Sequence, residues 1–373
     1  MPEVLPSVPS TMRAVRLVGH GGLDMLQYQD DVATPRPAAD EVLIRVGACG
    51  VNNTDINTRL AWYSKSVTEA TDAAGSGGFE TAKPGDSTWG GAGIGFPRIQ
   101  GADVAGTIMA VGAGVSESRL GERVLVDPWM RDARDPANRA LAGYLGSERD
   151  GGYAEFTAVP SVNAFAIQSP HSDAELATFP CSYSTGEYML TRTQLCAGET
   201  ILITGASGGV GSGLVQLAKR RGARVIAVAG RSKMEMVAAL GADRVIARDE
   251  AEFESAVRAA SDDGEVQVVA DVVGGSGFPC LVELLARGGR YVTSGAIAGP
   301  VVNLDLRSLY LKDLTLFGAT VMPVGIFESL VGHIERQEIR PLVAQTFPLE
   351  SIADAQSAFL LKQHVGNFVI TLR

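Results

Sequence analysis

Histidine and cysteine are scarce in this sequence and widely scattered. The 373 residues include four histidines and four cysteines, and no two cysteines have the spacing of metal ligands or of a disulfide framework. We therefore expect free thiols and a cytoplasmic protein, because a reducing compartment keeps cysteines unpaired. The sequence also lacks an apolar run long enough to span a bilayer. Its first residues lack the basic patch and apolar core of a signal peptide, so we expect no membrane association.

An excess of positive charge is absent as well. The formal net charge is −10, with 32 Lys and Arg against 42 Asp and Glu, which argues against a nucleic-acid partner. Hydrophobic residues make up 46% of the chain and charged residues 20%, as is typical of globular proteins. The length favours about two domains.

One glycine-rich segment carries the strongest local signal. Within Glu199–Arg221, a short apolar run over Ile201–Thr204 precedes a glycine cluster and then apolar residues at helical spacing. The cluster reads Ala206-x-Gly208-x-x-Gly211, with alanine in the first glycine position of a dinucleotide-binding fingerprint. A strand, a glycine turn and a helix N-terminus together favour binding of a pyrophosphate. The alternative, an ordinary glycine-rich turn, is less favoured because alternating strands and helices follow.

The first half of the chain predicts a β-structure. Residues 12–167 contain short apolar runs broken by Gly and Pro, with little helical periodicity between them. This pattern is typical of a partly open β-barrel. A long tract rich in Gly, Ser, Thr and Ala over Trp62–Pro97 is either a functional lid or disordered.

The second half predicts a different architecture. From about Ser172, strands and helices alternate, and we count six strands, which predicts a parallel, doubly wound sheet of the α/β class. We expect a dinucleotide-binding domain over residues 176–320. The catalytic domain is then expected over 1–175, completed by the C-terminal segment 321–373.

The turn after the second expected strand bears on the choice of cofactor. It reads Gly230-Arg231-Ser232-Lys233, without the carboxylate that would bind a free ribose 2′-hydroxyl. Arg231 and Lys233 can instead neutralise a 2′-phosphate, and Ser232 can hydrogen-bond it. Arg248, after the third strand, is a further candidate. A solvated basic turn is the alternative, but we predict NADP(H) rather than NAD(H).

Several further segments, taken with the glycine fingerprint, resemble the medium-chain dehydrogenase/reductase superfamily. In chain order they are GACGVNNTDINTR (Gly47–Arg59), GADVAGTIMAVG (Gly101–Gly112), GERV, DGGYAEF, CSYSTGEYMLTR, GASGGVGS, DVVGG, DLRSLYLKDLTLFGAT and HVGNFVI. The resemblance covers nearly the whole chain. It implies a Rossmann sheet, a GroES-like barrel and an active site in the cleft between them. It also implies a homodimer paired through the strand Leu314–Thr320.

The chain departs from the zinc-dependent alcohol dehydrogenases of this superfamily. Asn52 stands where they carry a catalytic cysteine, and Ala102 stands where they carry a histidine. The four-cysteine structural lobe is missing from Pro128–Asp150. Because a catalytic zinc needs three protein ligands, we expect no metal. The chain is more similar to the quinone oxidoreductase and enoyl reductase branch, which works without one.

Without a metal ion as Lewis acid, hydride transfer to an activated alkene is favoured over hydride transfer to an isolated ketone. Hydride adds to the β-carbon, and the protein must stabilise the developing enolate oxygen with hydrogen-bond donors. We predict that Tyr63 is this donor, as a tyrosine is in the resembling enoyl reductases, and that Thr54 and Asn52 give polar support. An aromatic residue packed at the base of the lid is the alternative for Tyr63. Turn residues are the alternative for Thr54 and Asn52.

The resemblance also carries further cofactor contacts over to this chain. Thr185 is expected near the nicotinamide, and Asn367 near the pyrophosphate or ribose. The other expected contacts, in the glycine turn and at strand ends, are Ala206, Ser207, Gly208, Gly209, Val210, Gly211, Val272, Val273, Gly274, Ser294, Gly295 and Ala296. The candidates for the substrate pocket, or else for core packing, are Trp62, Trp89, Trp129 and Met130.

The sequence thus favours an NADPH-dependent, metal-free oxidoreductase that acts on a small molecule, either an activated C=C (enone, enal or enoyl thioester) or a quinone. The alternative is an NADP(H)-dependent alcohol dehydrogenase or carbonyl reductase without zinc. A non-catalytic NADPH-binding interaction protein is the third reading, and the complete fingerprint with Tyr63 and Thr54 argues against it.

Overall fold

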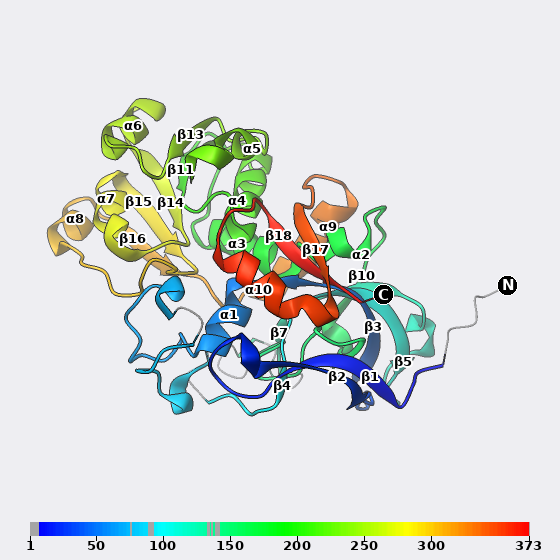
Figure 1. Cartoon of the computed structure of the whole chain (residues 1–373). Helices are drawn as coiled ribbons and strands as arrows, with labels where there is room; N and C mark the ends of the chain where they lie inside the picture. Colours follow the sequence, from blue (N-terminus) through cyan, green and yellow to red (C-terminus); the bar gives the residue numbers. More distant parts are fainter. Residues whose placement is uncertain are drawn as a thin grey trace.

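In the computed structural model, the described residues are 7–74, 77–88, 93–132, 135, 137–138 and 142–372. They form two bodies, each built on its own sheet (Figure 1). A parallel sheet with helices lies at the upper left of this view, and a set of mainly antiparallel strands lies at the lower right. The C-terminal segment, drawn in red, runs along the boundary between them.

The parallel sheet has six strands in the order β13-β12-β11-β14-β15-β16. Their bounds are β11 (Thr200–Ile203), β12 (Arg224–Ala229), β13 (Arg244–Ala247), β14 (Val266–Asp271), β15 (Leu285–Thr293) and β16 (Thr315–Gly318). Numbered along the chain, this order is 3-2-1-4-5-6, the arrangement of dinucleotide-binding sheets. The predicted doubly wound sheet of six strands is therefore confirmed.

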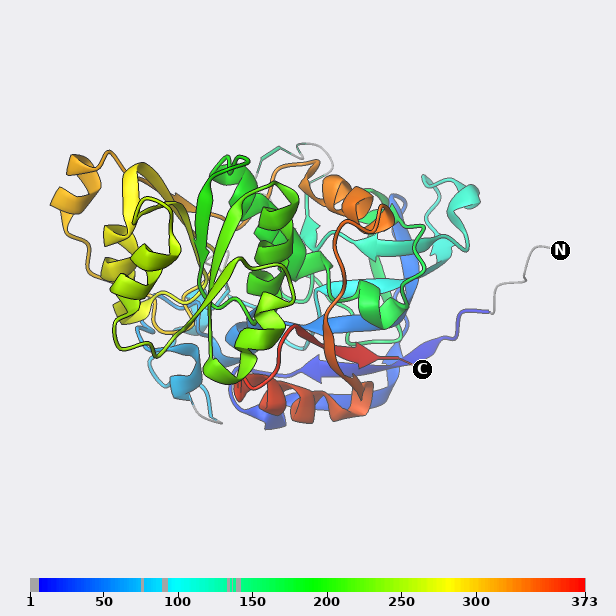
Figure 2. The same cartoon turned by 90° about the horizontal axis from the view of Figure 1, so that it is seen from above.

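Both faces of this sheet are covered, which explains its continuous runs of Val, Ile and Ala. Ile201 packs in one apolar cluster with Leu214 of the helix that follows the glycine turn, whereas its neighbour Leu202 packs in another cluster with Val257 and Leu281. Figure 2 shows helices on the two sides of the sheet. The helices of this region are α3 (Pro180–Arg192), α4 (Gly209–Arg220), α5 (Met234–Ala238), α6 (Phe253–Ala260), α7 (Phe278–Glu283) and α8 (Leu306–Leu311).

The second body is centred on a curved sheet in the order β10-β6-β5-β3-β18-β17, with β9 also paired to β3. Its strands are β3 (Glu41–Val51), β5 (Asp103–Val111), β6 (Arg123–Val126), β9 (Phe156–Pro160), β10 (Ala164–Ala166), β17 (Val343–Pro348) and β18 (Asn367–Thr371). Two smaller sheets are formed by β1 (Thr11–Leu17), β2 (Leu26–Ala33) and β4 (Arg98–Ile99), and by β7 (Trp129–Met130) and β8 (Gly143–Tyr144). The predicted barrel-like body is present.

The C-terminal segment completes the second body. It contains α9 (Ile326–Glu335), β17, α10 (Ile352–Leu360) and β18. Strand β18 pairs antiparallel with β3, with Val369 opposite Gly50. The expected return of the tail to the first part of the chain is therefore confirmed.

Three helices were not expected from the sequence. They are α1 (Asn53–Leu60), α8 and α9. Helix α7 ends at Glu283, because Leu285 already begins strand β15 beside β14. A short helix, α2 (Asp173–Leu176), leads into α3. Among the described residues, every helix is too short or too polar to cross a bilayer.

Candidate active site

A cavity of about 770 Å³ lies where the carboxyl ends of the parallel strands face the second body. This volume suits a ligand the size of a cofactor with a small substrate. The predicted residues in its lining are Asn52, Thr54, Tyr63, Thr185, Ser207, Gly208, Gly209, Val210, Gly211, Gly230, Lys233, Arg248, Val272, Val273, Gly274, Ser294, Gly295, Ala296 and Asn367. Three predicted contacts, Ala206, Arg231 and Ser232, lie outside this lining.

The glycine turn has no room for side chains at two positions. A Cβ on Gly211 would lie 2.2 Å from the carbonyl oxygen of Gly205, so α4 packs directly on the turn. A Cβ on Gly209 would lie 2.3 Å from Oδ1 of Asn367. Nδ2 of Asn367 is buried and has no partner among the described residues. A helix N-terminus with an orphaned amide beside it fits a phosphate or ribose hydroxyl of a dinucleotide.

Ala206 lies on the core side of the glycine turn. It is fully buried, and its N–H donates to the carbonyl of Val228 at 3.0 Å, which ties the turn to the neighbouring strand. Its methyl group lies in the core rather than in the cavity.

The residues predicted to bind a 2′-phosphate lie in two different environments. Lys233 and Arg248 both line the cavity, and after burial the charge of Arg248 is what lowers the pKa of Lys233. Arg231 instead extends outward and pairs with Asp249 and Glu250, with 58% of its side chain exposed. Ser232 is exposed. A cluster of two cations, rather than the whole turn, therefore faces the cavity.

The predicted catalytic side chains lie in and on either side of helix α1. It begins after Asn52, whose backbone N–H donates to Asp55 at 2.8 Å and so caps the helix. Thr54 and Asn57 lie in the first turns of α1, and Tyr63 follows its end. Burial raises the pKa of Tyr63, while hydrogen bonds with the side chains of Thr54 and Asn57 lower it. The phenol is therefore kept protonated and held beside a hydroxyl.

Asn52 lines the cavity and is hydrogen-bonded through both atoms of its side-chain amide. Its Nδ2 donates to the buried carboxylate of Asp103 at 2.8 Å, and its Oδ1 lies 3.4 Å from the hydroxyl of Ser182. Burial raises the pKa of Asp103 to about 7 and that of Asp55 to about 6. The amide N–H₂ thus points toward a protein carboxylate, and Asn52 contributes to the wall of the cavity.

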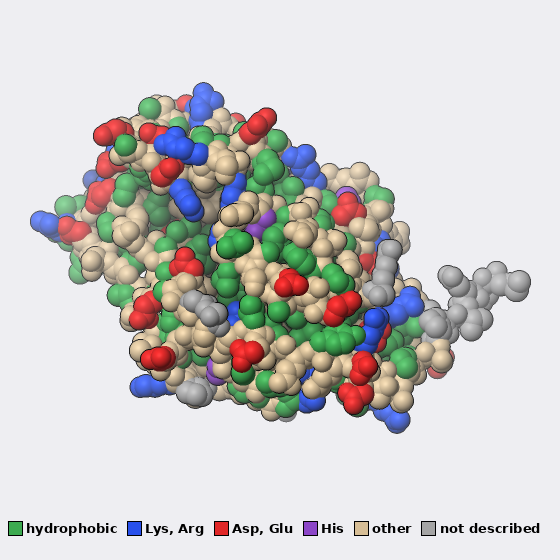
Figure 3. Space-filling view, viewed as in Figure 1, with side chains coloured by type: hydrophobic (Ala, Val, Ile, Leu, Met, Phe, Trp, Pro, Cys, Tyr) green, Lys and Arg blue, Asp and Glu red, His purple; other side chains and the backbone are tan. Residues whose placement is uncertain are grey.

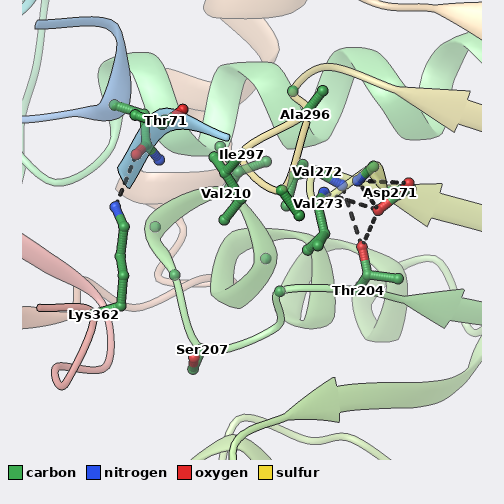
Figure 4. Close-up of a pocket in the computed structure, with 18 of the residues that line it drawn as sticks. Thr71, Thr204, Ser207, Val210, Asp271, Val272, Val273, Ala296, Ile297 and Lys362 are labelled. Atoms are coloured by element: carbon green, nitrogen blue, oxygen red, sulfur yellow. Dashed lines mark hydrogen bonds between the residues drawn. The ribbon is translucent and has the colours of Figure 1, made fainter. Parts of the chain in front are cut away.

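A further carboxylate organises the loop after β14. Asp271 accepts hydrogen bonds from Thr204 at 2.5 Å, from the backbone N–H of Val273 at 2.8 Å and from the hydroxyl of Tyr291 at 2.5 Å. Figure 4 shows the part of this network formed by Asp271, Thr204 and the backbone of the following loop, at the edge of the cavity. The sequence analysis did not identify Asp271, although a carboxylate at the end of a buried strand is a recognisable signal.

The first part of the Trp62–Pro97 tract contributes to one side of the cavity. Trp62 and Thr71 line it; the backbone N–H of Thr71 donates to the carbonyl of Ile297 at 3.0 Å, across from the second body to the parallel-sheet body. Trp129 and Met130 are instead buried in core clusters. Trp89 lies outside the described residues.

The lining also contains a lysine and a histidine that were not predicted. Lys362 and His364 lie in the loop between α10 and β18. In Figure 3, basic side chains and a histidine surround the hollow between the two bodies. The cavity is therefore more basic than the net charge of the chain indicates.

Two family models match the chain. The alcohol dehydrogenase GroES-like domain matches residues 38–169, and the zinc-binding dehydrogenase model matches residues 209–336. The quinone oxidoreductase of Rattus norvegicus is 27% identical over 97% of this chain and 98% of its own. The chloroplastic NADPH-dependent alkenal/one oxidoreductase of Arabidopsis thaliana is 28% identical over 98% of this chain and 80% of its own.

A solved structure from Sinorhizobium meliloti 1021, provisionally described as an alcohol dehydrogenase, is 47% identical. It covers 98% of both chains with a TM-score of 0.88. Fold and cavity together define an oxidoreductase with a Rossmann sheet and a GroES-like barrel. The chain belongs to the medium-chain dehydrogenase/reductase superfamily, within its quinone oxidoreductase-like branch.

One of the matching family models describes zinc-binding dehydrogenases, so the side chains at the place of the catalytic zinc decide whether a metal can bind here. Asn52 gives its amide to Asp103, and Ala102 is a buried side chain without a donor atom. Among the described residues, no three His, Cys, Asp or Glu side chains are grouped so as to hold a metal ion. The residues at this place do not fit a catalytic zinc.

Proposed function

We propose that this protein is an NADPH-dependent reductase of an activated C=C bond or a quinone, and that it works without a metal. The observation that carries the proposal is the arrangement of one cavity. The glycine turn, Lys233 and Arg248 line one part of it, and Tyr63 and Thr54, which carry hydroxyls, also line it. The names of the relatives in rat and Arabidopsis support the same class of substrate.

The proposed roles of the side chains follow from their chemistry. Bound NADPH supplies a hydride to the β-carbon of an alkene conjugated to a carbonyl group. Tyr63 donates its O–H to the carbonyl oxygen, where negative charge collects. The buried surroundings raise the pKa of Tyr63, so the phenol holds its proton at neutral pH and is available as a donor. Thr54 holds the phenol in place, and the α-carbon takes its proton from Tyr63 or from water.

The preference for NADPH over NADH is part of the proposal. Lys233 and Arg248 face the cavity after the second and third strands of the sheet, where the adenosine ribose binds in such folds. Neither pairs with a carboxylate among the residues described here. Two cations without counter-charges are suited to a 2′-phosphate.

The second candidate is a carbonyl reductase or alcohol dehydrogenase that uses NADP(H) without zinc. The structure from Sinorhizobium meliloti, described in those terms, favours it. Thr54 also stands where the alcohol dehydrogenases carry a proton-relay hydroxyl. A non-catalytic cofactor-binding role is the third candidate.

The deciding experiment is NADPH oxidation, followed optically, against an enone, an enal, an enoyl thioester, a quinone and a plain ketone. Turnover of an alkene or of the quinone that persists in the presence of a metal chelator supports the proposal. Turnover of the plain ketone alone supports the carbonyl reductase. If NADPH binds tightly but no substrate reacts, the non-catalytic role gains support. Preference for NADH contradicts the cofactor assignment.

We further propose a catalytic domain over 1–175 with 321–373, a nucleotide-binding domain over 176–320, and a cytoplasmic homodimer. The four cysteines are all unpaired, as is usual in a reducing compartment. Strand β16 ends the order of the parallel sheet, so one of its edges is available to a second copy.

A further inference from the structure

Lys362 is a half-buried lysine without a carboxylate partner in the part of the chain that the structure describes. It follows α10, and its Nζ donates to Oδ1 of Asn53 at 2.8 Å. The ammonium group also lies 3.8 Å from the centre of the Phe359 ring. Among the residues described, no carboxylate lies within ion-pair distance of this Nζ. Because burying an unpaired charge is costly, such a group is suited to a ligand that supplies the missing negative charge.

The loop that carries Lys362 is joined to the glycine turn. The backbone N–H of Gly366 donates to the carbonyl of Ser207 at 3.0 Å. Nζ of Lys233 donates to the carbonyl of Lys362 and lies 3.5 Å from Oγ of Ser207. The backbone of Lys362 is therefore held near the phosphate-binding turn by two contacts.

The side chain of Lys362 leaves this junction in the other direction. Figure 4 shows it extended along the cavity toward Thr71, with Ser207 and Val210 across from it. It ends at Asn53, in the first turn of α1. Lys233 and Arg248 lie at the ribose end of the cavity, so Lys362 brings positive charge to a separate part of the lining.

We propose that Lys362 binds the pyrophosphate of the dinucleotide from the side opposite the glycine turn, and that it takes up a proton when the cofactor binds. This inference rests on the proposed function, because it requires a dinucleotide in the cavity. The helix N-terminus at Gly209 meets the pyrophosphate with partial charges only. Lys362 supplies a full charge, and its contact with Asn53 links the bound phosphate to the helix that carries Thr54.

The ionisation of Lys362 supports the uptake of a proton. The pKa of Lys362 is lowered to about 7, chiefly by burial; the charge of Asp72, in the turn Thr71–Ala74, opposes this shift and the charge of Lys233 adds to it. His364 lies on the same loop and has its own pKa lowered to about 4 by burial, so it is neutral at neutral pH. Near pH 8 most of the Lys362 side chain is uncharged before binding, and a bound pyrophosphate favours the charged form.

The test is calorimetric titration of the full chain with NADPH and with NADH. Wild type and Lys362→Met are compared at about pH 6 and about pH 8, in buffers of different ionisation enthalpy. We expect Lys362→Met to weaken both cofactors by the same factor, about ten- to hundredfold, as for a lost charge-assisted hydrogen bond. Wild type should take up close to one proton per cofactor at the higher pH and almost none at the lower, and the variant should lose this uptake.

Matched variants separate the outcomes. Methionine at this half-buried lysine position is expected to preserve folding, which a thermal melt checks. Lys65→Met, at an exposed lysine, should bind like wild type. Lys362→Arg should bind both cofactors without proton uptake, because a guanidinium stays charged. Lys233→Met should keep the uptake, which excludes Lys233 as its source.

Three results would overturn the inference while leaving the proposed function intact. The first is equal affinity of wild type and Lys362→Met for the cofactors, and the second is proton uptake that is unchanged in the variant. The third is a loss of affinity confined to NADPH, which would assign Lys362 to the 2′-phosphate. Failure of the wild type to bind either dinucleotide would instead overturn the proposed function itself.

Discussion

The side-chain amide of Asn52 and the carboxylate of Asp103 are joined by a hydrogen bond of 2.8 Å in the wall of the cavity. Asp103 also accepts the backbone N–H of Cys181 at 2.6 Å, so one buried carboxylate links the start of α1 to the start of α3. Burial raises the pKa of Asp103 to about 7, although both of these hydrogen bonds oppose the rise. Its ionisation therefore falls in the range where stability is normally measured.

Asp103→Asn is expected to flatten the dependence of stability on pH. A carboxyl whose pKa is raised in the folded state stabilises that state while it is protonated, and this contribution is lost as pH rises from about 4 through about 7. The Tm of the wild type should therefore fall between about pH 5 and pH 8. Each 1 kcal/mol lost from the free energy of unfolding lowers the Tm by on the order of 2 °C in a chain of this size. Asp55, with a pKa of about 6, adds to the wild-type fall.

Differential scanning calorimetry across this pH range makes the measurement. Asp30→Asn, at an exposed aspartate on β2, is the control and should reproduce the wild-type slope. A variant Asp103→Asn with that same slope would show that the carboxyl ionises at its ordinary pKa.

Tyr63→Phe is expected to lower kcat by at least about tenfold, equivalent to about 1.4 kcal/mol of barrier. The substitution removes only the O–H that is proposed to stabilise the enolate oxygen, so the affinity for NADPH should stay unchanged. Steady-state kinetics on the substrate identified by the panel give kcat, and a binding titration gives the affinity. Tyr28→Phe, with 41% of that residue exposed on β2, is the matched control. An unchanged kcat would remove Tyr63 from the mechanism.

The architecture was predictable from the sequence because its signals are local. The glycine turn after Ile201–Thr204 and the alternating apolar runs identify a parallel sheet without any knowledge of tertiary contacts. Helix α1 was missed because Ile56 and Leu60 are its only large apolar residues, which gives little periodicity. Its N-cap signal, Asn52 followed by Asp55 at the third helical position, was nevertheless readable.

The site was predictable only in part, since it is assembled from distant segments. Lys362 reaches the cavity because β18 pairs with β3 and so brings the preceding loop to the glycine turn, more than 150 residues away in sequence. No spacing rule connects these segments. Arg231 and Lys233, in contrast, are two residues apart but face different ways, because the acids at Asp249 and Glu250 draw Arg231 outward. Composition alone does not distinguish the two side chains.

Lys233→Met is therefore expected to reduce the preference for NADPH over NADH by about tenfold or more, as for a lost charge-assisted contact to a phosphate. Arg231→Met should have a smaller effect, because Arg231 already has two carboxylate partners at the surface. The ratio of kcat/KM for the two cofactors is the measurement. A larger effect at Arg231 than at Lys233 would mean that the ion pairs of Arg231 open when the cofactor binds.

Leu316→Lys is expected to convert a homodimer into a monomer. Leu316 lies in the edge strand β16 with 37% of the residue exposed, and the nearby helix α8 exposes 65% of Leu306 and 62% of Tyr310. Two copies paired through β16 would cover these apolar side chains, whereas two lysines facing each other across the two-fold axis would repel. Sedimentation velocity distinguishes the two states. Val162→Lys, at a position 70% exposed on the other body, should leave the dimer intact, and a wild type that sediments as a monomer would disprove the proposed assembly.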